Sequence, residues 1–215
     1  MTRITKDPEE RKNDILNAAM MLFKEKGYEK TVVGDIVKAA SIAQGTFYIY
    51  YKSKEDVFLA VLENSREEIM EKLIEVQKNC ELNAVEKLNL ITKLEFDLNR
   101  DQDELFVQLH LGKNVGVHQK FIINAINKLK PIYASVIEQG MQEGLFDTIY
   151  PKESAEYMLV ATKFMFDPGI FRADPKDLKI KAEATEYICE RVLGAPKNSF
   201  NSPNSTCLLK GEDQL

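Results

Sequence analysis

One short segment carries side chains that could contact nucleic acid. It combines uncharged hydrogen-bonding groups, a glycine and two lysines, namely Gln44, Gly45, Thr46, Tyr48, Lys52 and Lys54. Uncharged donors and acceptors suit base edges and phosphates, a glycine allows close backbone approach, and lysines neutralise phosphate charge. This combination predicts a DNA-contacting surface and not a catalytic centre.

The elements around this segment have the pattern of a helix-turn-helix. Two short helices, expected at about 33–40 and 44–50, are joined by small residues that permit a close crossing: Ala39, Ala40, Ser41 and Ala43. The second helix of such a unit must enter a major groove about 12 Å wide. A first helix is expected from Pro8 to Gly27, and a long helix from Ser53 to about Lys78.

The run from Thr31 to Asp56 resembles the DNA-binding signature of TetR-family transcriptional regulators. Its most specific parts are Gly-Thr-Phe-Tyr at 45–48 and Lys-Ser-Lys-Glu at 52–55, and the resemblance covers residues 8–56. It implies phosphate contacts from Thr31, Tyr48 and Lys54. It also implies an all-helical regulatory domain with a ligand cavity, and a homodimer joined through the last two large helices.

The sequence departs from that family pattern at four positions. Ser41 stands where glycine is usual in the turn, so a positive φ there would be slightly strained. Ala43 replaces a serine cap of the second helix, a loss of about 1 kcal/mol. Ile49 stands where histidine is frequent, and Tyr51 stands at a phenylalanine position. These differences bear on operator preference and leave the expected fold unchanged.

Helical signals continue to the end of the chain, so the predicted fold class is all-α, with an N-terminal three-helix helix-turn-helix domain and a larger C-terminal helical domain. Further helices are expected at about 83–99, 101–113, 117–144, 153–166 and 174–193, with Pro131 kinking or breaking the third of these. We expect a DNA-binding domain at 1–52, a regulatory and dimerisation domain at 53–194, and a disordered tail at 195–215, which is rich in Asn, Ser and Pro.

The larger domain lacks recognisable catalytic or phosphate-binding motifs, and we expect no enzyme activity, cofactor or metal site. His110 and His118 are eight residues apart, which is not the spacing of a metal-binding pair. Candidates for an effector cavity are large apolar groups and two polar ones: Phe96, Phe106, His110, Phe121, Tyr133, Phe164 and Met165. Candidates for a dimer seam are two helix faces: Tyr157, Val160, Ala161 and Phe164, and Ala184, Tyr187, Ile188 and Val192.

The charge balance divides along the chain. The formal net charge is −5, which taken alone argues against DNA binding. Residues 1–55, however, hold 10 Lys/Arg and 8 Asp/Glu, a net +2, and residues 56–215 have a net charge of −7. An acidic body would therefore orient the basic head towards DNA. The sequence shows no secretory signal, no membrane-spanning run and no cysteine framework, so we expect a soluble cytoplasmic protein.

These observations predict a homodimeric, sequence-specific regulator, most simply a repressor released from a palindromic operator by an apolar or amphipathic effector. Two alternatives remain open on the sequence. One is a helical enzyme or lipid carrier whose head binds another protein, and the other is an architectural DNA-binding protein without an effector.

Overall fold

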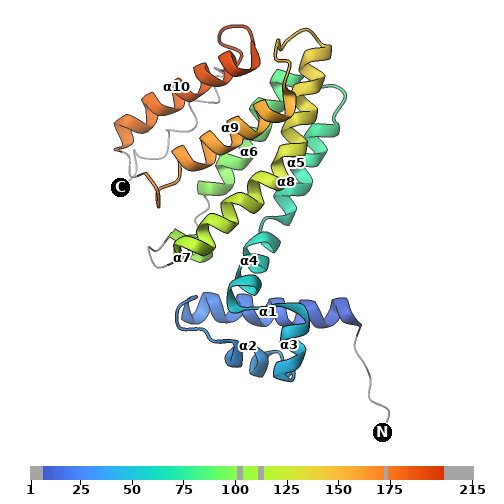
Figure 1. The fold of residues 1–215 in the computed structure, drawn as a ribbon, viewed down its shortest axis with the longest axis vertical. Helices are drawn as coiled ribbons and strands as arrows, with labels where there is room; N and C mark the ends of the chain where they lie inside the picture. Colours follow the sequence, from blue (N-terminus) through green and yellow to red (C-terminus); the bar gives the residue numbers. More distant parts are fainter. Residues whose placement is uncertain (1–6, 101–103, 111–113, 172–173, 201–215) are drawn as a thin grey trace. The chain divides into compact units, whose positions relative to one another are not determined.

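The structure is a computed structural model that describes residues 7–100, 104–110, 114–171 and 174–200. Within these ranges the regular structure is entirely helical (Figure 1). The helices are α1 (Pro8–Lys26), α2 (Val33–Ala39), α3 (Gln44–Tyr50), α4 (Lys54–Asn64), α5 (Glu67–Lys78), α6 (Ala84–Arg100), α7 (Glu104–His110), α8 (Val115–Gln142), α9 (Pro151–Met165) and α10 (Pro175–Leu193). The predicted all-α fold class is confirmed.

Local capping signals place several of these boundaries. The Asp7 carboxylate accepts the Glu9 N–H at 2.8 Å, Pro8 occupies the first helical position, and α1 ends at Gly27 with a φ of 81°. Asn83 and Glu86 cap α6 reciprocally: each side chain accepts the other residue's backbone N–H, at 3.0 and 2.9 Å. Such caps satisfy N–H groups that have no partner inside the helix.

The prediction of one long helix from Ser53 is wrong, because this segment forms two helices, α4 and α5. At the break, the Ser65 hydroxyl donates to the Leu62 carbonyl at 2.8 Å, and the Arg66 N–H donates to the Glu63 carbonyl at 3.1 Å. A serine hydroxyl competes with the backbone for carbonyl acceptors, and this competition interrupts the helical ladder. Conversely, α8 continues through Pro131 without breaking.

The chain forms two compact units. The first contains residues 1–67 and 102–118, so α7 belongs with α1–α4. Its buried core is drawn from each of these helices: Ile15, Ala19, Leu22, Phe23, Ile36, Phe47, Val57, Phe58, Leu62, Leu105 and Leu109. The Phe23 and Phe58 rings meet edge to face with centroids 4.9 Å apart, which locks α1 onto α4.

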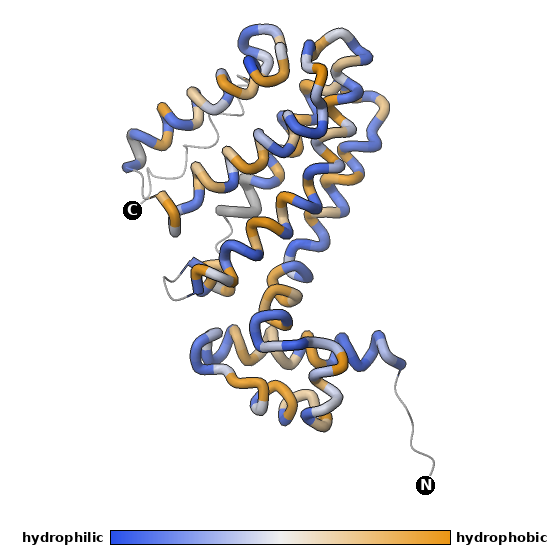
Figure 2. The backbone as a smooth tube through the Cα atoms, in the orientation of Figure 1, coloured by the Kyte–Doolittle hydropathy of each residue, from blue (hydrophilic) through white to orange (hydrophobic). Residues whose placement is uncertain are grey.

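The second unit contains residues 68–101 and 119–215. Its helices α5, α6, α8 and α9 lie side by side (Figure 1), and apolar and polar residues alternate along them at helical intervals (Figure 2). One apolar cluster fills the space between them, including Leu73, Leu88, Ile91, Ile126, Ile137, Met158 and Leu159.

The start of the expected tail differs from the prediction of disorder. Ala195 and Phe200 are buried in the core of the second unit, and the Phe200 ring lies 6.4 Å from that of Phe146. Gly194 ends α10 with a φ of 63°, which turns the chain back onto this core. Residues 201–215 lie outside the described part of the chain.

Candidate DNA-binding interface

Helices α2 and α3 each bury one side chain completely in the core of the first unit: Ile36 of α2 and Phe47 of α3. Between them the Ile42 N–H donates to the Val37 carbonyl at 3.1 Å, which closes the turn. Ser41 adopts a φ of 52°, as the sequence departure from glycine predicts. The predicted helix-turn-helix is therefore present, with its strain at the expected residue.

The surface of α3 that points away from this core carries the predicted reading groups. Gln44 and Gly45 are exposed, Tyr48 is 49% exposed, and Thr46 is half-buried. A Cβ built on Gly45 would meet no atom within 4 Å, so the backbone of α3 is open to a close-approaching partner. Because the edges of DNA bases present donors and acceptors, this face suits direct readout.

Ile49 also belongs to this face, and sequence reasoning did not assign it a contact. Its side chain is 78% exposed, the highest value among the large apolar residues on the described part of the chain. An exposed apolar side chain next to polar readers can contact a thymine methyl group. The sequence signal for an Ile49 contact was its position directly after Tyr48 on a seven-residue helix.

The two lysines after α3 differ in their surroundings. Lys52 is exposed, while its backbone N–H donates to the Asp56 carboxylate at 3.0 Å. Lys54 instead donates its ammonium to the Tyr28 carbonyl at 2.8 Å and lies 4.2 Å from the centre of the Tyr28 ring. Partial burial lowers the pKa of Lys54, against the opposing effect of Glu29. Lys54 thus joins the start of α4 to the turn after α1, whereas Lys52 is exposed. The phosphate contacts of both lysines stay predictions.

Thr31 differs from the other predicted DNA contacts in its surroundings. Its side chain is fully buried, and its hydroxyl donates to the carbonyls of Gly27, at 2.8 Å, and Leu22, at 3.3 Å. The N-cap of α2 is the next residue, Val32. The Thr31 hydroxyl therefore fixes the end of α1, and in the single chain the side chain is not open to a phosphate.

A second long-range clamp holds the end of α1. The Gln108 side chain of α7 accepts the Tyr28 N–H at 2.7 Å and donates to the Phe23 carbonyl at 3.0 Å. The Tyr28 N–H lies beyond the last residue of α1, and the Phe23 carbonyl, which already accepts the Gly27 N–H at 3.1 Å, gains a second donor. Sequence reasoning missed Gln108, because no local pattern relates residues 80 positions apart.

The predicted effector residues are divided between the two units. In the first unit, Phe106 is half-buried beneath the Arg66 guanidinium, 4.1 Å from its ring centre, and His110 is half-buried at the end of α7. In the second unit Phe121 and Tyr133 are buried, and Phe164 and Met165 are half-buried. Phe96 lies in α6, but its side chain is outside the described part of the chain.

Tyr133 is part of a polar cluster inside the second unit. Its hydroxyl donates to the Glu95 carboxylate at 2.8 Å, and the other Glu95 oxygen lies 3.1 Å from the Lys163 ammonium. Burial, followed by the charge of Glu95, raises the pKa of Tyr133 well above its usual range. Tyr133 therefore remains a neutral donor, and Glu95 and Lys163 are polar groups that the sequence pattern did not single out.

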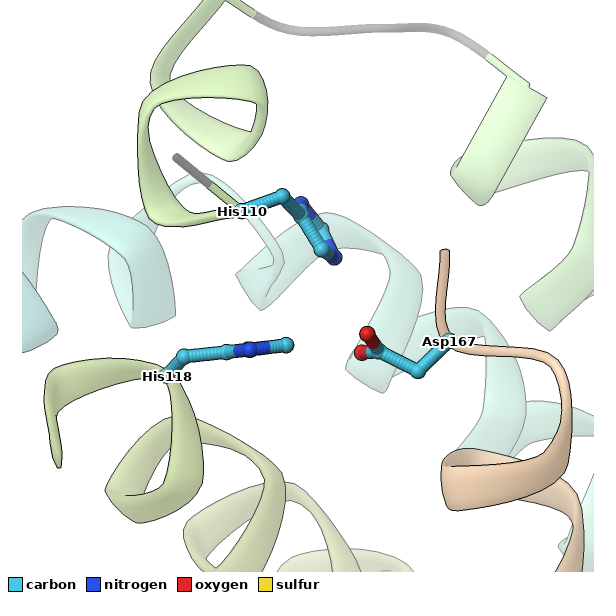
Figure 3. Close-up of side chains that lie close together, drawn as sticks. All are labelled: His110, His118 and Asp167. Atoms are coloured by element: carbon cyan, nitrogen blue, oxygen red, sulfur yellow. The ribbon is translucent and has the colours of Figure 1, made fainter. Parts of the chain in front are cut away.

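The structure brings His110 and His118 together, although their eight-residue spacing is not that of a metal-binding pair on one helix. Figure 3 shows His110 at the end of α7 and His118 in the first turn of α8; their ring centres are 4.6 Å apart and their planes are inclined at 65°. Asp167, also labelled there, belongs to the second unit, where its carboxylate accepts the N–H groups of Gly169 and Ile170. The two histidines lie on different helices, so the spacing rule for ligands on one helix does not apply to them.

The two predicted dimer faces are largely exposed in the single chain. On α9, Tyr157 and Val160 are exposed while Ala161 and Phe164 are half-buried; on α10, Ala184, Tyr187 and Ile188 are exposed and Val192 is half-buried. Large exposed apolar side chains on neighbouring helices are typical of an interaction surface. Among the described helices, none is both long and apolar enough to cross a bilayer.

Comparisons with known proteins agree with this architecture. A family model described as bacterial regulatory proteins, tetR family, matches residues 15–61, and one described as tetracyclin repressor-like, C-terminal domain, matches residues 96–188. The HTH-type transcriptional regulator YfiR of Bacillus subtilis is 35% identical over 202 residues, which cover 90% of this chain and 97% of YfiR.

Two further proteins are similar to the chain, one in sequence and one in fold. The fatty acid metabolism regulator protein of Bacillus subtilis is 31% identical over 134 residues, spanning 61% of this chain and 66% of that protein. The structure of RolR in complex with resorcinol has a TM-score of 0.61 at 17% identity, with 94% of each chain covered, so its likeness is one of fold.

Proposed function

The chain belongs to the TetR family of bacterial transcriptional regulators and is a DNA-binding regulator, not an enzyme; on that premise we propose that its operator is read by α3. The observation that carries this proposal is the exposed face of Gln44, Gly45, Tyr48 and Ile49 above a buried anchor at Phe47. Gln44 and Thr46 contact base edges, Ile49 contacts a methyl group, and Tyr48 and Lys52 bind phosphates.

We further propose that two chains bind together through the exposed faces of α9 and α10. An isologous dimer places two α3 helices in successive major grooves, about 34–36 Å apart, on a roughly palindromic operator. Each half-site adds its contacts, so the modest positive charge of one head is sufficient for specific binding by the pair. Because the pair occupies promoter DNA, it acts in the cytoplasm as a repressor.

The effector is a small apolar or amphipathic molecule bound in the second unit. Support comes from the apolar core of the second unit, which includes Tyr133 and packs against Phe164, and from the burial of Phe121. Tyr133 is the polar group that orients the ligand. The fold neighbour RolR was solved with resorcinol, a small aromatic diol. Release follows when the effector binds more tightly to a dimer whose heads have the wrong spacing for the operator.

Binding to the DNA upstream of the protein's own gene tests the assignment of α3. Fluorescence anisotropy over a range of salt concentrations separates charge contacts from base contacts. Lys52→Ala is expected to weaken binding to all sequences and to reduce the salt slope by about 1, because one phosphate contact is lost. Lys24→Ala, an exposed lysine on α1, is the matched control and retains the wild-type slope.

Gln44→Ala completes the test, because it removes a base reader and no charge. It is expected to leave the salt slope unchanged and to reduce discrimination between the operator and substituted operators by about 1–3 kcal/mol. Discrimination equal to the wild type in Gln44→Ala, together with an unchanged slope in Lys52→Ala, would contradict the proposed interface.

A further inference from the structure

We propose that His110 and His118 are two ligands of a transition-metal site at the junction of α7 and α8 (Figure 3). One ring nitrogen of His110 and one of His118 lie within 4.8 Å of each other. In tetrahedral coordination, two imidazole nitrogens bound to one Zn²⁺ at about 2.0–2.1 Å are about 3.3–3.4 Å apart. Rotation of the side chains that closes at most about 1.5 Å therefore brings both nitrogens onto one metal ion.

The tautomer of His110 is set by its backbone contact. Its Nδ1 lies 2.7 Å from the Phe106 carbonyl oxygen. A carbonyl can only accept, so Nδ1 carries a proton, and in the neutral ring Nε2 then carries the lone pair. Metal-binding histidines are commonly oriented in this way, by donation of the other ring N–H to a backbone carbonyl. His110 thus has the support that a metal ligand requires.

Hydrogen bonds connect the backbone around His118 to α7, the helix that carries His110. Its N–H donates to the Asn114 carbonyl at 2.9 Å, and the Asn114 side-chain amide donates to the Gln108 carbonyl at 3.2 Å. Asn114 and His118 are both buried. These bonds hold the first turn of α8 against α7, so the two rings are positioned before any metal binds, and less ordering is needed on binding.

The chemistry of the donors selects the class of metal. Imidazole nitrogens suit Zn²⁺, Cu²⁺ and Ni²⁺, whereas Mg²⁺ and Ca²⁺ prefer oxygen ligands. Two histidines leave further coordination positions for water or other donors. The site is independent of the effector proposed above, because it rests on residues of the first unit alone.

The whole chain contains only two histidines, which makes the test unusually direct. Untagged full-length protein is titrated calorimetrically with Zn²⁺ and, separately, with Mg²⁺. We expect one Zn²⁺ per chain and no Mg²⁺ binding. His110→Gln and His118→Gln should each weaken Zn²⁺ binding at least tenfold, while the exposed neighbour variant Gln119→Ala binds as the wild type does. Cys80→Ser, at an exposed thiol, should also leave the titration unchanged.

Pulsed electron paramagnetic resonance with Cu²⁺ counts the imidazoles directly. The wild type should show two coordinated imidazoles and each single variant one. If burial of His118 makes its variant unfold, the half-buried His110→Gln variant decides alone. Zn²⁺ affinity equal to the wild type in His110→Gln, or a Cu²⁺ spectrum with fewer than two imidazoles in the wild type, overturns the proposal.

Discussion

Gly45 offers a sharp test of the reading face, because the chain supplies its own control. Gly45 and Gly34 are the second residues of the seven-residue helices α3 and α2. Both are exposed, and a Cβ built on either would meet no atom within 4 Å. Alanine at either position is therefore expected to fit the folded chain equally well.

The two substitutions should have the same effect on folding. Replacing a helical glycine with alanine stabilises a helix by up to about 0.5–1 kcal/mol, since the unfolded chain loses conformational freedom. For a chain of this size, 1 kcal/mol corresponds to a shift of about 2–4 °C in Tm. Both variants should therefore unfold at, or a few degrees above, the wild-type temperature.

Their effects on DNA binding should differ. If the backbone of α3 approaches the bases at Gly45, the added methyl group separates them, and we expect the Kd to rise at least tenfold, which is about 1.4 kcal/mol. Gly34→Ala should stay within about twofold of the wild type. The salt dependence should not change in either variant, because no charge is removed.

Anisotropy titrations with the upstream DNA fragment, paired with thermal unfolding of the same samples, give both quantities. Equal affinities for Gly45→Ala and Gly34→Ala would refute the reasoning, since α3 would then not approach the bases at this point. A fall in Tm for Gly45→Ala would refute the premise that the position is open.

Four further outcomes are expected. Tyr51→Phe should stabilise the chain by up to about 1–3 kcal/mol in urea unfolding, because the Tyr51 hydroxyl is buried without a hydrogen-bond partner among the described residues. A loss of stability would show that this hydroxyl does have a hydrogen-bond partner. Thr31→Val should cost about 1–3 kcal/mol in the same assay and leave the affinity for DNA intact, since its hydroxyl bonds are internal; an equal loss of affinity for all DNA sequences would instead support a phosphate contact from Thr31. Burial raises the pKa of the Cys189 thiol to about 11, so at pH 8 only about one thousandth of it is thiolate. Iodoacetamide labelling, mapped by mass spectrometry, should therefore reach Cys80 before Cys189 and should label Cys189 faster as the pH increases; equal rates at pH 8 would contradict this. Tyr187→Glu should shift the chain to monomer in light scattering, whereas Tyr150→Glu, exposed just before α9, should not; a dimeric Tyr187→Glu variant would place the seam elsewhere.

Local signals in the sequence were sufficient for most helix boundaries. Asp7 and Pro8 start α1, Gly27 ends it, and Asn83 with Glu86 starts α6, because each signal acts within one turn of helix. The turn at Ser41 and the burial of Phe47 are also as a helix-turn-helix pattern requires. Where neighbouring residues determine the structure, sequence reasoning is adequate.

The misses share a different physical origin. Apolar periodicity is the same on both sides of Ser65, so it cannot reveal that a hydroxyl bond divides α4 from α5. The internal hydrogen bonds of Thr31 and Lys54, which the sequence did not predict, depend on the carbonyls that lie at the end of α1. His110 and His118 meet only because two helices join between them. Such contacts are properties of tertiary packing and leave no periodic trace.

The Gln108 clamp has a consequence for recombination between regulators. Exchanging heads and bodies is a natural way to combine one operator with another effector. A hybrid that takes only residues 1–67 would inherit α1 without Gln108, leaving the Tyr28 N–H and the Phe23 carbonyl without these side-chain partners and removing the buried Leu105 and Leu109. A functional hybrid therefore needs two segments of the first unit, 1–67 and 102–118. The part that recognises the operator is not one continuous stretch of the sequence.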